Sequence, residues 1–270
     1  MTTQTISQTI QAHYEKYGWR RRESGDFEDF LLLIDNRPLM RPYYEHSYRR
    51  LDHYFETNGN YFLDAGSGGN PAQEYSGQFE KHVCVDFALA GLLESKQKLG
   101  NKGLCVVADL AHLPFKDNSF AGGISANSLY HLPPDRQTLA LAEYHRTMQS
   151  HATFVIIYIS GYVLGLGKIG RNLWRKLTGY QPPLAIQQNP DISTPPCWAM
   201  LPGWFSQQLG PQTEVELTTY RLLHRHISSR FIPNSSLGEQ ILAGLTWLEA
   251  TFPKLLMPFG YYVTVAFRKK

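Results

Sequence analysis

The chain has 270 residues, with 26 basic and 23 acidic side chains and three cysteines. This length favours one large domain over two small ones, and the near balance of charge lacks the strong basic excess that is typical of nucleic-acid binding. The cysteines have no paired spacing, which excludes a disulfide framework and a zinc site. Residues 1–11 have neither a basic nor an apolar region, so we expect no signal peptide and a cytoplasmic protein.

Residues 1–58 predict a helical N-terminal segment, interrupted at Gly18, Gly25 and Asn36-Arg37-Pro38. From residue 59, short β-branched and aromatic runs alternate with segments of helical period. The expected strands are Tyr61–Ala65, His82–Asp86, Gly103–Ala108, Phe120–Ala126 and Thr153–Ser160, and the expected helices follow Pro71, cover Ala88–Leu99 and run from Pro133-Pro134 to Met148. This alternation predicts right-handed crossovers and a parallel sheet.

The start of the helix after the first strand is predicted in detail. Asn70 suits the cap position, Pro71 suits the first helical position, and Gln73 stands where a capping box places glutamate or glutamine. The exposed amides of that helix are expected to face an anionic group.

The stretch 161–200 breaks the strand–helix rhythm. Its amphipathic part, Leu164–Leu177, is either a cap helix over the site or an interfacial helix that contacts anionic lipid. The chain then returns to the sheet with a helix at Trp204–Leu209, a strand at Glu214–Tyr220, a helix at Leu237–Thr251 and a strand at Tyr261–Arg268. We therefore divide the sequence into an N-terminal lid (1–58), a core (59–160), an inserted cap (161–200) and the C-terminal part of the core (201–270).

The most informative feature is a set of four loops that follow successive strands, because ligands bind beyond the carboxyl ends of an open parallel sheet. The first loop is Asp64-Ala65-Gly66-Ser67-Gly68-Gly69-Asn70. Its glycines allow a tight turn and a close approach of the backbone to a ligand, because they carry no Cβ. A tight turn without a ligand is the alternative interpretation.

Acidic residues end the second and third strands. Asp86 stands about twenty positions after the glycines, where a carboxylate accepts both hydroxyls of a ribose; the alternatives are a surface carboxylate or a cap for the helix from Ala88. Asp109 is placed to accept the exocyclic amine of an adenine, with Leu110 covering the ring; the alternative is a turn aspartate. The fourth loop, residues 125–131, returns to the middle of the sheet.

A dinucleotide site shares several of these features. Its glycine fingerprint, however, needs a third glycine where this chain has Pro71. An NAD site also gives no reason for Asp109-Leu110. We therefore favour a ligand other than NAD.

With these loops in place, residues 60–160 resemble the class I S-adenosylmethionine-dependent methyltransferases, most closely the small-molecule group with a Leu-Pro-Phe turn, here Leu113-Pro114-Phe115. The resemblance implies a Rossmann-like three-layer α/β sandwich, whose mostly parallel seven-stranded sheet has an antiparallel last strand. It implies S-adenosyl-L-methionine as cofactor. The implied contacts are Asp64, Gly66, Ser67, Gly68 and Asn70 for the methionine moiety, Asp86 for the ribose, Phe87, Asp109 and Leu110 around the adenine, and Asn127 for the ligand backbone.

The sequence departs from the family pattern at three places. Asn70 replaces the third glycine, Ala121 replaces an acidic residue, and Ser150-His151 replaces a Gly-Gly turn. Asparagine tolerates left-handed dihedrals, so we expect Asn70 to preserve the loop.

Methyl transfer requires alignment of acceptor and methyl group, exclusion of water and, for some acceptors, removal of a proton. His131 is the candidate general base, since an imidazole titrates near neutral pH, and Tyr130 is expected in the same pocket; a structural role is the alternative for both. Aromatic residues of the N-terminal segment are expected to close over the cofactor and to contact the sulfonium through cation–π attraction, or else to serve in packing; they are Tyr14, Trp19, Tyr43, Tyr44 and His46. Of these, Tyr14, Trp19, Tyr44 and His46 are also the candidate substrate contacts.

The sequence thus predicts a methyltransferase that acts on an oxygen, nitrogen or carbon atom of a small molecule. No metal and no nucleic-acid partner are expected. One alternative is a non-catalytic binding or regulatory protein of this fold, suggested by Asn70 and Ala121. Another is a membrane-associated enzyme with a lipid-linked acceptor, suggested by residues 161–177.

Overall fold

The computed structural model describes residues 10–19, 34–56, 58–162 and 197–270. The strands are β1 (Gly59–Ala65), β2 (Phe79–Asp86), β3 (Gly103–Val107), β4 (Phe120–Ala126), β5 (Met148–Ile159), β6 (Thr213–Arg221) and β7 (Tyr262–Lys269). The α-helices are α3 (Arg41–Arg49), α4 (Leu89–Leu99), α5 (Pro134–Thr147), α7 (Gly203–Leu209), α8 (Arg225–Phe231) and α9 (Ser236–Thr251). The shorter helical turns are η1 (Tyr14–Gly18), η2 (Pro38–Met40), η3 (Asp52–Phe55), η4 (Gln73–Tyr75), η5 (Gly100–Lys102), η6 (Leu129–His131) and η7 (Met257–Phe259).

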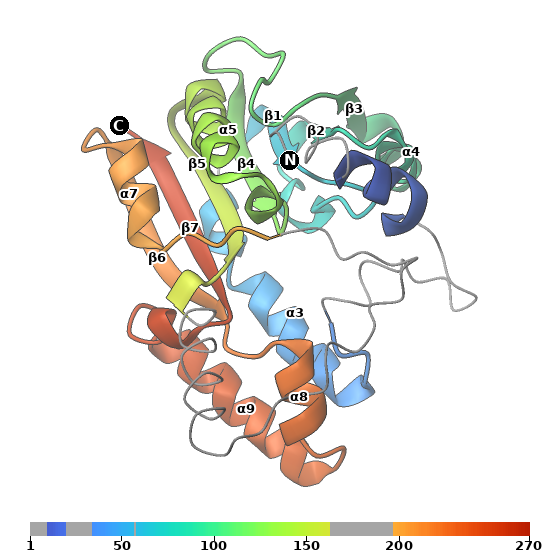
Figure 1. The fold of residues 1–270 in the computed structure, drawn as a ribbon, viewed down its shortest axis with the longest axis vertical. Coiled ribbons are helices and arrows are strands. Elements are labelled where there is room, and N and C mark those ends of the chain that lie inside the picture. The colour runs from blue at the N-terminus through green and yellow to red at the C-terminus, as the bar shows by residue number, and fades with distance from the viewer. Residues whose placement is uncertain (1–9, 20–33, 57, 163–196) are drawn as a thin grey trace, which may run out of the picture.

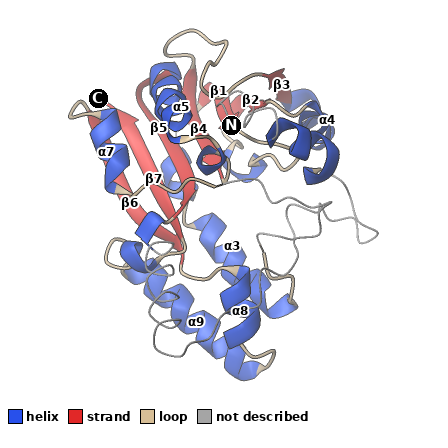
Figure 2. Cartoon of the chain, in the orientation of Figure 1, coloured by secondary structure: helices blue, strands red, loops and turns tan. Residues whose placement is uncertain are grey.

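The strands form one seven-stranded sheet in the order β3-β2-β1-β4-β5-β7-β6, with helices on both sides (Figures 1 and 2). Strands β1 to β5 pair in parallel, whereas β7 runs antiparallel to both β5 and β6. Strand β6 is therefore parallel to β5, and every strand except β7 ends at the same edge of the sheet. The predicted Rossmann-like α/β fold is confirmed, including the antiparallel strand β7 at the end of the chain.

Strand β5 shows why its sequence lacks polar alternation. Phe154 and Ile156 belong to the core cluster on one face of the sheet, whereas Val155 and Ile157 belong to the cluster on the other. Successive side chains of a strand point to opposite faces, so a strand covered on both faces is apolar throughout.

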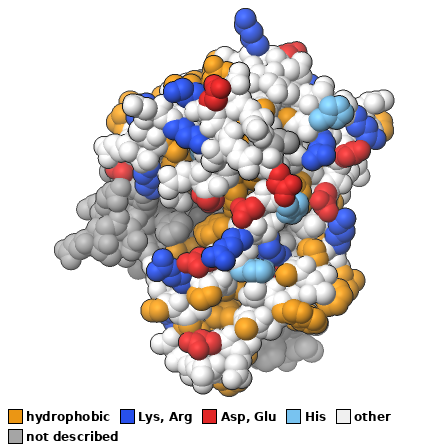
Figure 3. Space-filling model, turned by 180° about the vertical axis from the view of Figure 1, so that it is seen from behind, with side chains coloured by type: hydrophobic (Ala, Val, Ile, Leu, Met, Phe, Trp, Pro, Cys, Tyr) orange, Lys and Arg blue, Asp and Glu red, His pale blue; other side chains and the backbone are white. Residues whose placement is uncertain are grey.

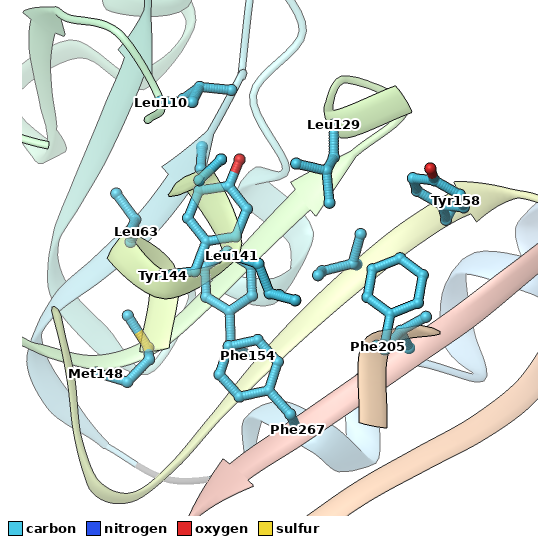
Figure 4. Packing of buried hydrophobic residues seen from close by; sticks show 14 of the residues in the cluster. Leu63, Leu110, Leu129, Leu141, Tyr144, Met148, Phe154, Tyr158, Phe205 and Phe267 are labelled. Carbon is cyan, nitrogen blue, oxygen red and sulfur yellow. The ribbon is translucent and has the colours of Figure 1, made fainter. Parts of the chain in front are cut away.

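The larger of these clusters is built around stacked rings. Phe154 of β5 lies between Tyr144 of α5 and Phe267 of β7, with ring centroids 4.7 and 5.3 Å away (Figure 4). All three rings are fully or almost fully buried. This packing ties α5 to the antiparallel part of the sheet.

Helices α3, α8 and α9 form a separate group, below the sheet in Figure 1. Met40, Tyr43, Tyr44, Ile232 and Leu242 form the apolar cluster that joins them. Helix α8 was not predicted, because Arg225–Phe231 contains few apolar residues and no periodic pattern. The group lies beyond the carboxyl ends of β5 and β6 and therefore borders that side of the sheet.

The predicted α-helix after the glycine loop is wrong. Only the short turn η4 forms there, its cap residue is Ala72, and no side chain caps it. Gly77 and the start of β2 at Phe79 leave room for a single turn, and the amide of Ala72 is already bound by the Asp64 carboxylate at 2.8 Å. Asn70 therefore caps no helix.

Most of the predicted cap, including Leu164–Leu177, lies outside the described residues. Among the helices that are described, none has the length and apolar character needed to cross a bilayer. Acidic and basic side chains are interspersed on the face shown in Figure 3, in keeping with the nearly balanced charge.

Candidate functional site

A cleft lies at the carboxyl edge of the sheet and extends from the end of β2 to the end of β6. Among the predicted site residues it is lined by Tyr14, Trp19, Gly66, Ser67, Asn70, Asp86, Phe87, Asn127 and His131. The predicted residues Asp64, Gly68, Asp109, Leu110, Tyr130, Tyr44 and His46 do not line it directly. The local geometry explains each of these placements.

The glycine loop is held in a conformation that favours glycine. Gly66 and Gly68 have φ angles of +77° and +49°, in the region that side chains with a Cβ rarely adopt. The amide of Gly66 donates to the carbonyl of Val85 at 2.7 Å, which draws the loop toward the end of β2. A Cβ on Gly66 would lie 2.3 Å from the Ser128 hydroxyl. Asn70 has no positive φ, so the expected left-handed asparagine is not what preserves the loop.

Asp64 supports this loop from below. It is 2% exposed, and its Oδ2 accepts the amide of Ala72 at 2.8 Å and lies 3.0 Å from Nε2 of the buried His82. The other imidazole nitrogen of His82 is 2.9 Å from the Ser76 hydroxyl. With Cys84, these side chains form a buried group whose possible metal-ligand atoms lie within 4.8 Å of one another. Since Asp64 and His82 already use these atoms in hydrogen bonds, the group is best explained as structural support.

Asp86 lies at the end of β2 and lines the cleft while being only 6% exposed. Its two carboxylate oxygens accept backbone amides from either side, Gly68 at 3.0 Å and Ala88 at 2.9 Å. Burial raises the pKa of this carboxyl to about 6, against the opposing effect of these hydrogen bonds. Asp86 therefore fixes the glycine loop and also presents a carboxylate to the cleft.

Asp109 does not converge with Asp86 on the cleft. Its side chain is about half exposed, accepts the amide of Ala111 at 3.0 Å and forms an ion pair with Arg136 of α5. Leu110 is buried, and its side chain lies 3.4 Å from the position of a Cβ on Gly66. The geometry thus agrees with the turn-aspartate interpretation of Asp109, because its carboxylate accepts the Ala111 amide, pairs with Arg136 and does not line the cleft.

The fourth loop brings Asn127 and His131 to the middle of the cleft. Asn127 has a φ of +56°, and its amide donates to Ile157 on the neighbouring strand at 3.1 Å. Tyr130 is 3% exposed and packs beneath, with its ring centroid 4.5 Å from that of His131. Nδ1 of His131 lies 3.6 Å from the sulfur of Cys197.

Part of the N-terminal segment docks over the cleft. The carboxylate of Glu15 accepts the amides of Leu89 and Ala90 at 2.7 and 3.2 Å, at the N-terminus of α4, where backbone amides lack helical partners. Glu15 thereby places Tyr14 with its ring centroid 6.3 Å from Phe87 and 6.0 Å from His131.

Trp19 closes the outer side of the glycine loop. Its indole occupies the space that a Cβ on Gly68 would enter, at 1.7 Å, and also contacts Gly69 and Gly91. Absence of side chains at these glycines is therefore what admits the indole. No sequence pattern linked Trp19 to the loop.

Three predicted aromatic residues of α3 do not reach the cleft. Tyr43 and Tyr44 face α9, and the Tyr43 hydroxyl donates to Glu249 at 2.5 Å. The Tyr44 hydroxyl accepts the amide of Asp35 at 2.8 Å, and His46 lies away from the cleft lining. Helix α3 buries this face against α9, so its packing requirement decides the orientation.

The far end of the cleft contains side chains that the sequence analysis missed. They are Tyr48 of α3, Glu74 and Tyr75 of η4, and Tyr220 and Arg221 of β6. Arg221 directly follows the predicted strand Glu214–Tyr220, so the strand-end rule applied to the first four loops would have found it if extended to β6.

Comparison with known proteins adds a family match and several structural similarities. Residues 63–156 match the family described as a methyltransferase domain. No curated protein matches the sequence. The fold is similar to that of magnesium protoporphyrin IX methyltransferase from Synechocystis PCC 6803, determined with bound S-adenosylhomocysteine, at 13% identity and a TM-score of 0.60 over 98% of this chain and 100% of that one.

Two archaeal structures are similar as well. An S-adenosylmethionine-dependent methyltransferase from Methanosarcina mazei is 14% identical, with a TM-score of 0.53 over 81% of this chain and 95% of that one. A structure from the complex between the Haloferax volcanii Trm112 methyltransferase activator and its methyltransferase is 13% identical, with a TM-score of 0.53 over 85% and 91% of the two chains. At these identities the structures establish the fold only.

Proposed function

We propose that this chain, whose residues 63–156 form an S-adenosylmethionine-dependent methyltransferase domain, transfers the methyl group to an oxygen, nitrogen or carbon atom of a small organic molecule. The family match confirms the resemblance drawn from residues 60–160 and S-adenosylmethionine as the cofactor. The observation that carries the proposal is the single cleft shared by the glycine loop, the Asp86 carboxylate and the His131 loop.

The described residues fit this cofactor at the β1–β2 end of the cleft. Gly66 presents a backbone free of Cβ toward the methionine moiety, and Asp86 presents a buried carboxylate toward the ribose hydroxyls. Phe87 offers a ring beside the adenine, and Asn127 offers an amide side chain at the middle of the cleft. We assign Asp64 a supporting role under the loop, and Asp109 a place in the turn after β3.

The bound cofactor supplies a methyl group already activated by a positive sulfur, so the protein's contribution is mainly positional. Tyr14 and Trp19 exclude water from the cleft, and the Tyr14 ring is placed to face a cationic centre between Phe87 and His131. His131 is the proposed base for acceptors that lose a proton, with Tyr130 positioning its ring from beneath.

The first experiment is calorimetric titration of the protein with S-adenosylhomocysteine. We expect binding at micromolar concentrations, accompanied by a higher melting temperature. No binding at millimolar ligand would refute the proposal. Transfer of a labelled methyl group to any member of a panel of phenols, amines and acids would then exclude the non-catalytic alternative.

The role of His131 is tested with an acceptor found in that panel. His131→Gln is expected to lower kcat about 100-fold while leaving the affinity for S-adenosylhomocysteine unchanged. His112→Gln is the matched control, because His112 is exposed and lies outside the cleft lining. An unchanged kcat would assign His131 a structural role.

A further inference from the structure

Arg221 is a buried cation for which the described residues supply no hydrogen-bond or ion-pair partner. It is 3% exposed, and within the parts of the chain that the structure describes its guanidinium takes part in no hydrogen bond and no ion pair. Its Nε is sealed from solvent, whereas the two Nη nitrogens keep access to the cleft that Arg221 lines. The hydroxyl of the adjacent Tyr220 is likewise buried without a partner among the described residues.

Aromatic rings hold this guanidinium in place. Its central carbon lies 5.0 Å from the ring centroid of Tyr44, 4.9 Å from that of Tyr220 and 5.1 Å from that of Tyr262. These cation–π contacts offset only part of the cost of removing a charge from water. Arginine cannot lose its proton in a protein, so the guanidinium stays charged, and no anion among the described residues neutralises it.

Neither of two carboxylates on this side of the molecule pairs with Arg221. Glu74 lines the same end of the cleft but forms no ion pair with Arg221 among the described residues, and Glu249 is already engaged. Glu249 accepts the Tyr43 hydroxyl, the amide of Leu222 at 2.8 Å and the guanidinium of Arg50 at 3.1 Å. Arg50 donates in addition to three backbone carbonyls. Arg50 is thus a structural cation whose partners are in place, whereas the part of the chain that the structure describes offers Arg221 no such partner.

We propose that Arg221 binds a carboxylate of the methyl acceptor, so that the substrate is a small organic acid with an aromatic or apolar body. The planar fork of a guanidinium matches a carboxylate with two parallel hydrogen bonds. The rings of Tyr48 and Tyr75 line the same end of the cleft and provide an apolar surface for the body of the acid.

The position of Arg221 in the sheet favours the acceptor over the cofactor as the source of this carboxylate. Between β1, which carries the glycine loop, and β6 lie three strands, a separation of about 19 Å at ordinary strand spacing. From β4, which carries Asn127, the separation is about 14 Å, and the arginine side chain extends back over Tyr262 of β7. The side chain of Arg221 therefore spans part of this separation, and acids of about the size of 3-phenylpropionate are the probes chosen for the space between Arg221 and the Asn127–His131 loop.

This inference rests on the proposed function and is tested by binding rather than by turnover. The probes are benzoate, 3-phenylpropionate and octanoate, each paired with its neutral amide, added to protein saturated with S-adenosylhomocysteine. The proteins are the wild type, Arg221→Met, Arg221→Lys and the control Arg230→Met, whose arginine is exposed on α8. Binding is measured by calorimetry and by the shift in melting temperature.

We expect at least one acid to bind the wild type and Arg230→Met at least tenfold more tightly than its amide. Arg221→Met should lose this preference, and Arg221→Lys should retain part of it. Without probe, Arg221→Met should melt at the same or a higher temperature, because it removes an uncompensated buried charge. That result also shows that the variant is folded.

The inference is overturned if no acid binds the wild type, if acids and amides bind equally, or if Arg221→Met keeps the preference for acids. It is also overturned if Arg221→Met weakens S-adenosylhomocysteine tenfold or more, since Arg221 would then serve the cofactor. Failure of the proposed function looks different, because S-adenosylhomocysteine would then bind to none of the four proteins.

Discussion

The two ends of the cleft each contain a buried charged side chain, but they differ in the partners that the protein provides for it. At the β1–β2 end, both oxygens of Asp86 accept backbone amides, from Gly68 and Ala88. At the β6 end, the guanidinium of Arg221 contacts only aromatic rings among the described residues. The Asp86 carboxylate therefore has its hydrogen-bond partners before any ligand binds, whereas the partner that we propose for Arg221 comes from a ligand.

This difference matches what each end is proposed to bind. A cofactor that is the same in every turnover is served by a fixed backbone cradle, in which little reorganisation is needed on binding. An acceptor is selected by a side chain whose partner only the correct substrate supplies, because a buried unpaired charge disfavours ligands without one. Changes to the backbone should thus affect the first end most, and changes to one side chain the second.

The largest effect is expected from Gly66→Ala. The methyl group would lie 2.3 Å from the Ser128 hydroxyl, and φ is +77°. The left-handed backbone and the overlap together should lower the free energy of unfolding by about 3 kcal/mol and reduce affinity for S-adenosylhomocysteine at least tenfold. Chemical denaturation and calorimetry measure the two quantities.

Gly77→Ala is the matched control, since Gly77 has no positive φ and no atom lies within 4 Å of its added Cβ. It should leave both quantities nearly unchanged. Equal behaviour of the two variants would mean that the loop at Gly66 is not a rigid cradle, and the contrast between the ends of the cleft would fail.

An intermediate effect is expected from the protonation of Asp86. Burial raises the pKa of this carboxyl to about 6, and its proposed role as acceptor for the ribose hydroxyls requires the ionised form. The dissociation constant of S-adenosylhomocysteine should therefore rise up to tenfold per pH unit below about 6. Calorimetry between pH 5 and pH 8 should show this slope in the wild type and a flat profile in Asp86→Asn; a slope that persists in the variant would assign the titration to another group.

The raised pKa of Asp86 also determines how the free energy of unfolding changes with pH. Because the pKa in the folded chain lies above the ordinary value of 3.8, the folded chain binds more protons than the unfolded chain between about pH 4 and pH 6. The Asp86 contribution to the free energy of unfolding therefore decreases as pH rises through this window. Asp86→Asn should remove that decrease in urea denaturation.

The difference between the two ends of the cleft also explains which features could be predicted from the sequence. The strands were found to within a few residues, apart from the early start of β5 at Met148, because a sheet covered on both faces requires apolar runs such as Phe154–Ile157. The glycine loop and Asp86 were found because their positions follow from backbone geometry at strand ends. Features fixed by the chain's own local chemistry are visible in the sequence.

The remaining site features depend on long-range packing. The turn of Asp109 toward Arg136 and the burial of Tyr44 against the α9 group require knowledge of which helix lies beside them. Arg50 has partners and Arg221 has none among the described residues, and no local sequence pattern separates the two. The α-helix predicted after Asn70-Pro71 does not form, because the carboxylate of Asp64 binds the amide of Ala72, which lies eight residues later in the chain.

The smallest effect concerns the N-terminal segment, which closes the cofactor end through Glu15. Glu15→Gln keeps the shape of the side chain but removes the charge that accepts the Leu89 and Ala90 amides at the start of α4. Loss of this interaction should cost about 1 kcal/mol and weaken S-adenosylhomocysteine about fivefold, chiefly through faster dissociation. Stopped-flow displacement measures the rate, with the exposed Glu80→Gln as control. An unchanged dissociation rate would show that the segment over Phe87 does not retain the cofactor, and that the completeness of this end depends on the glycine loop and Asp86 alone.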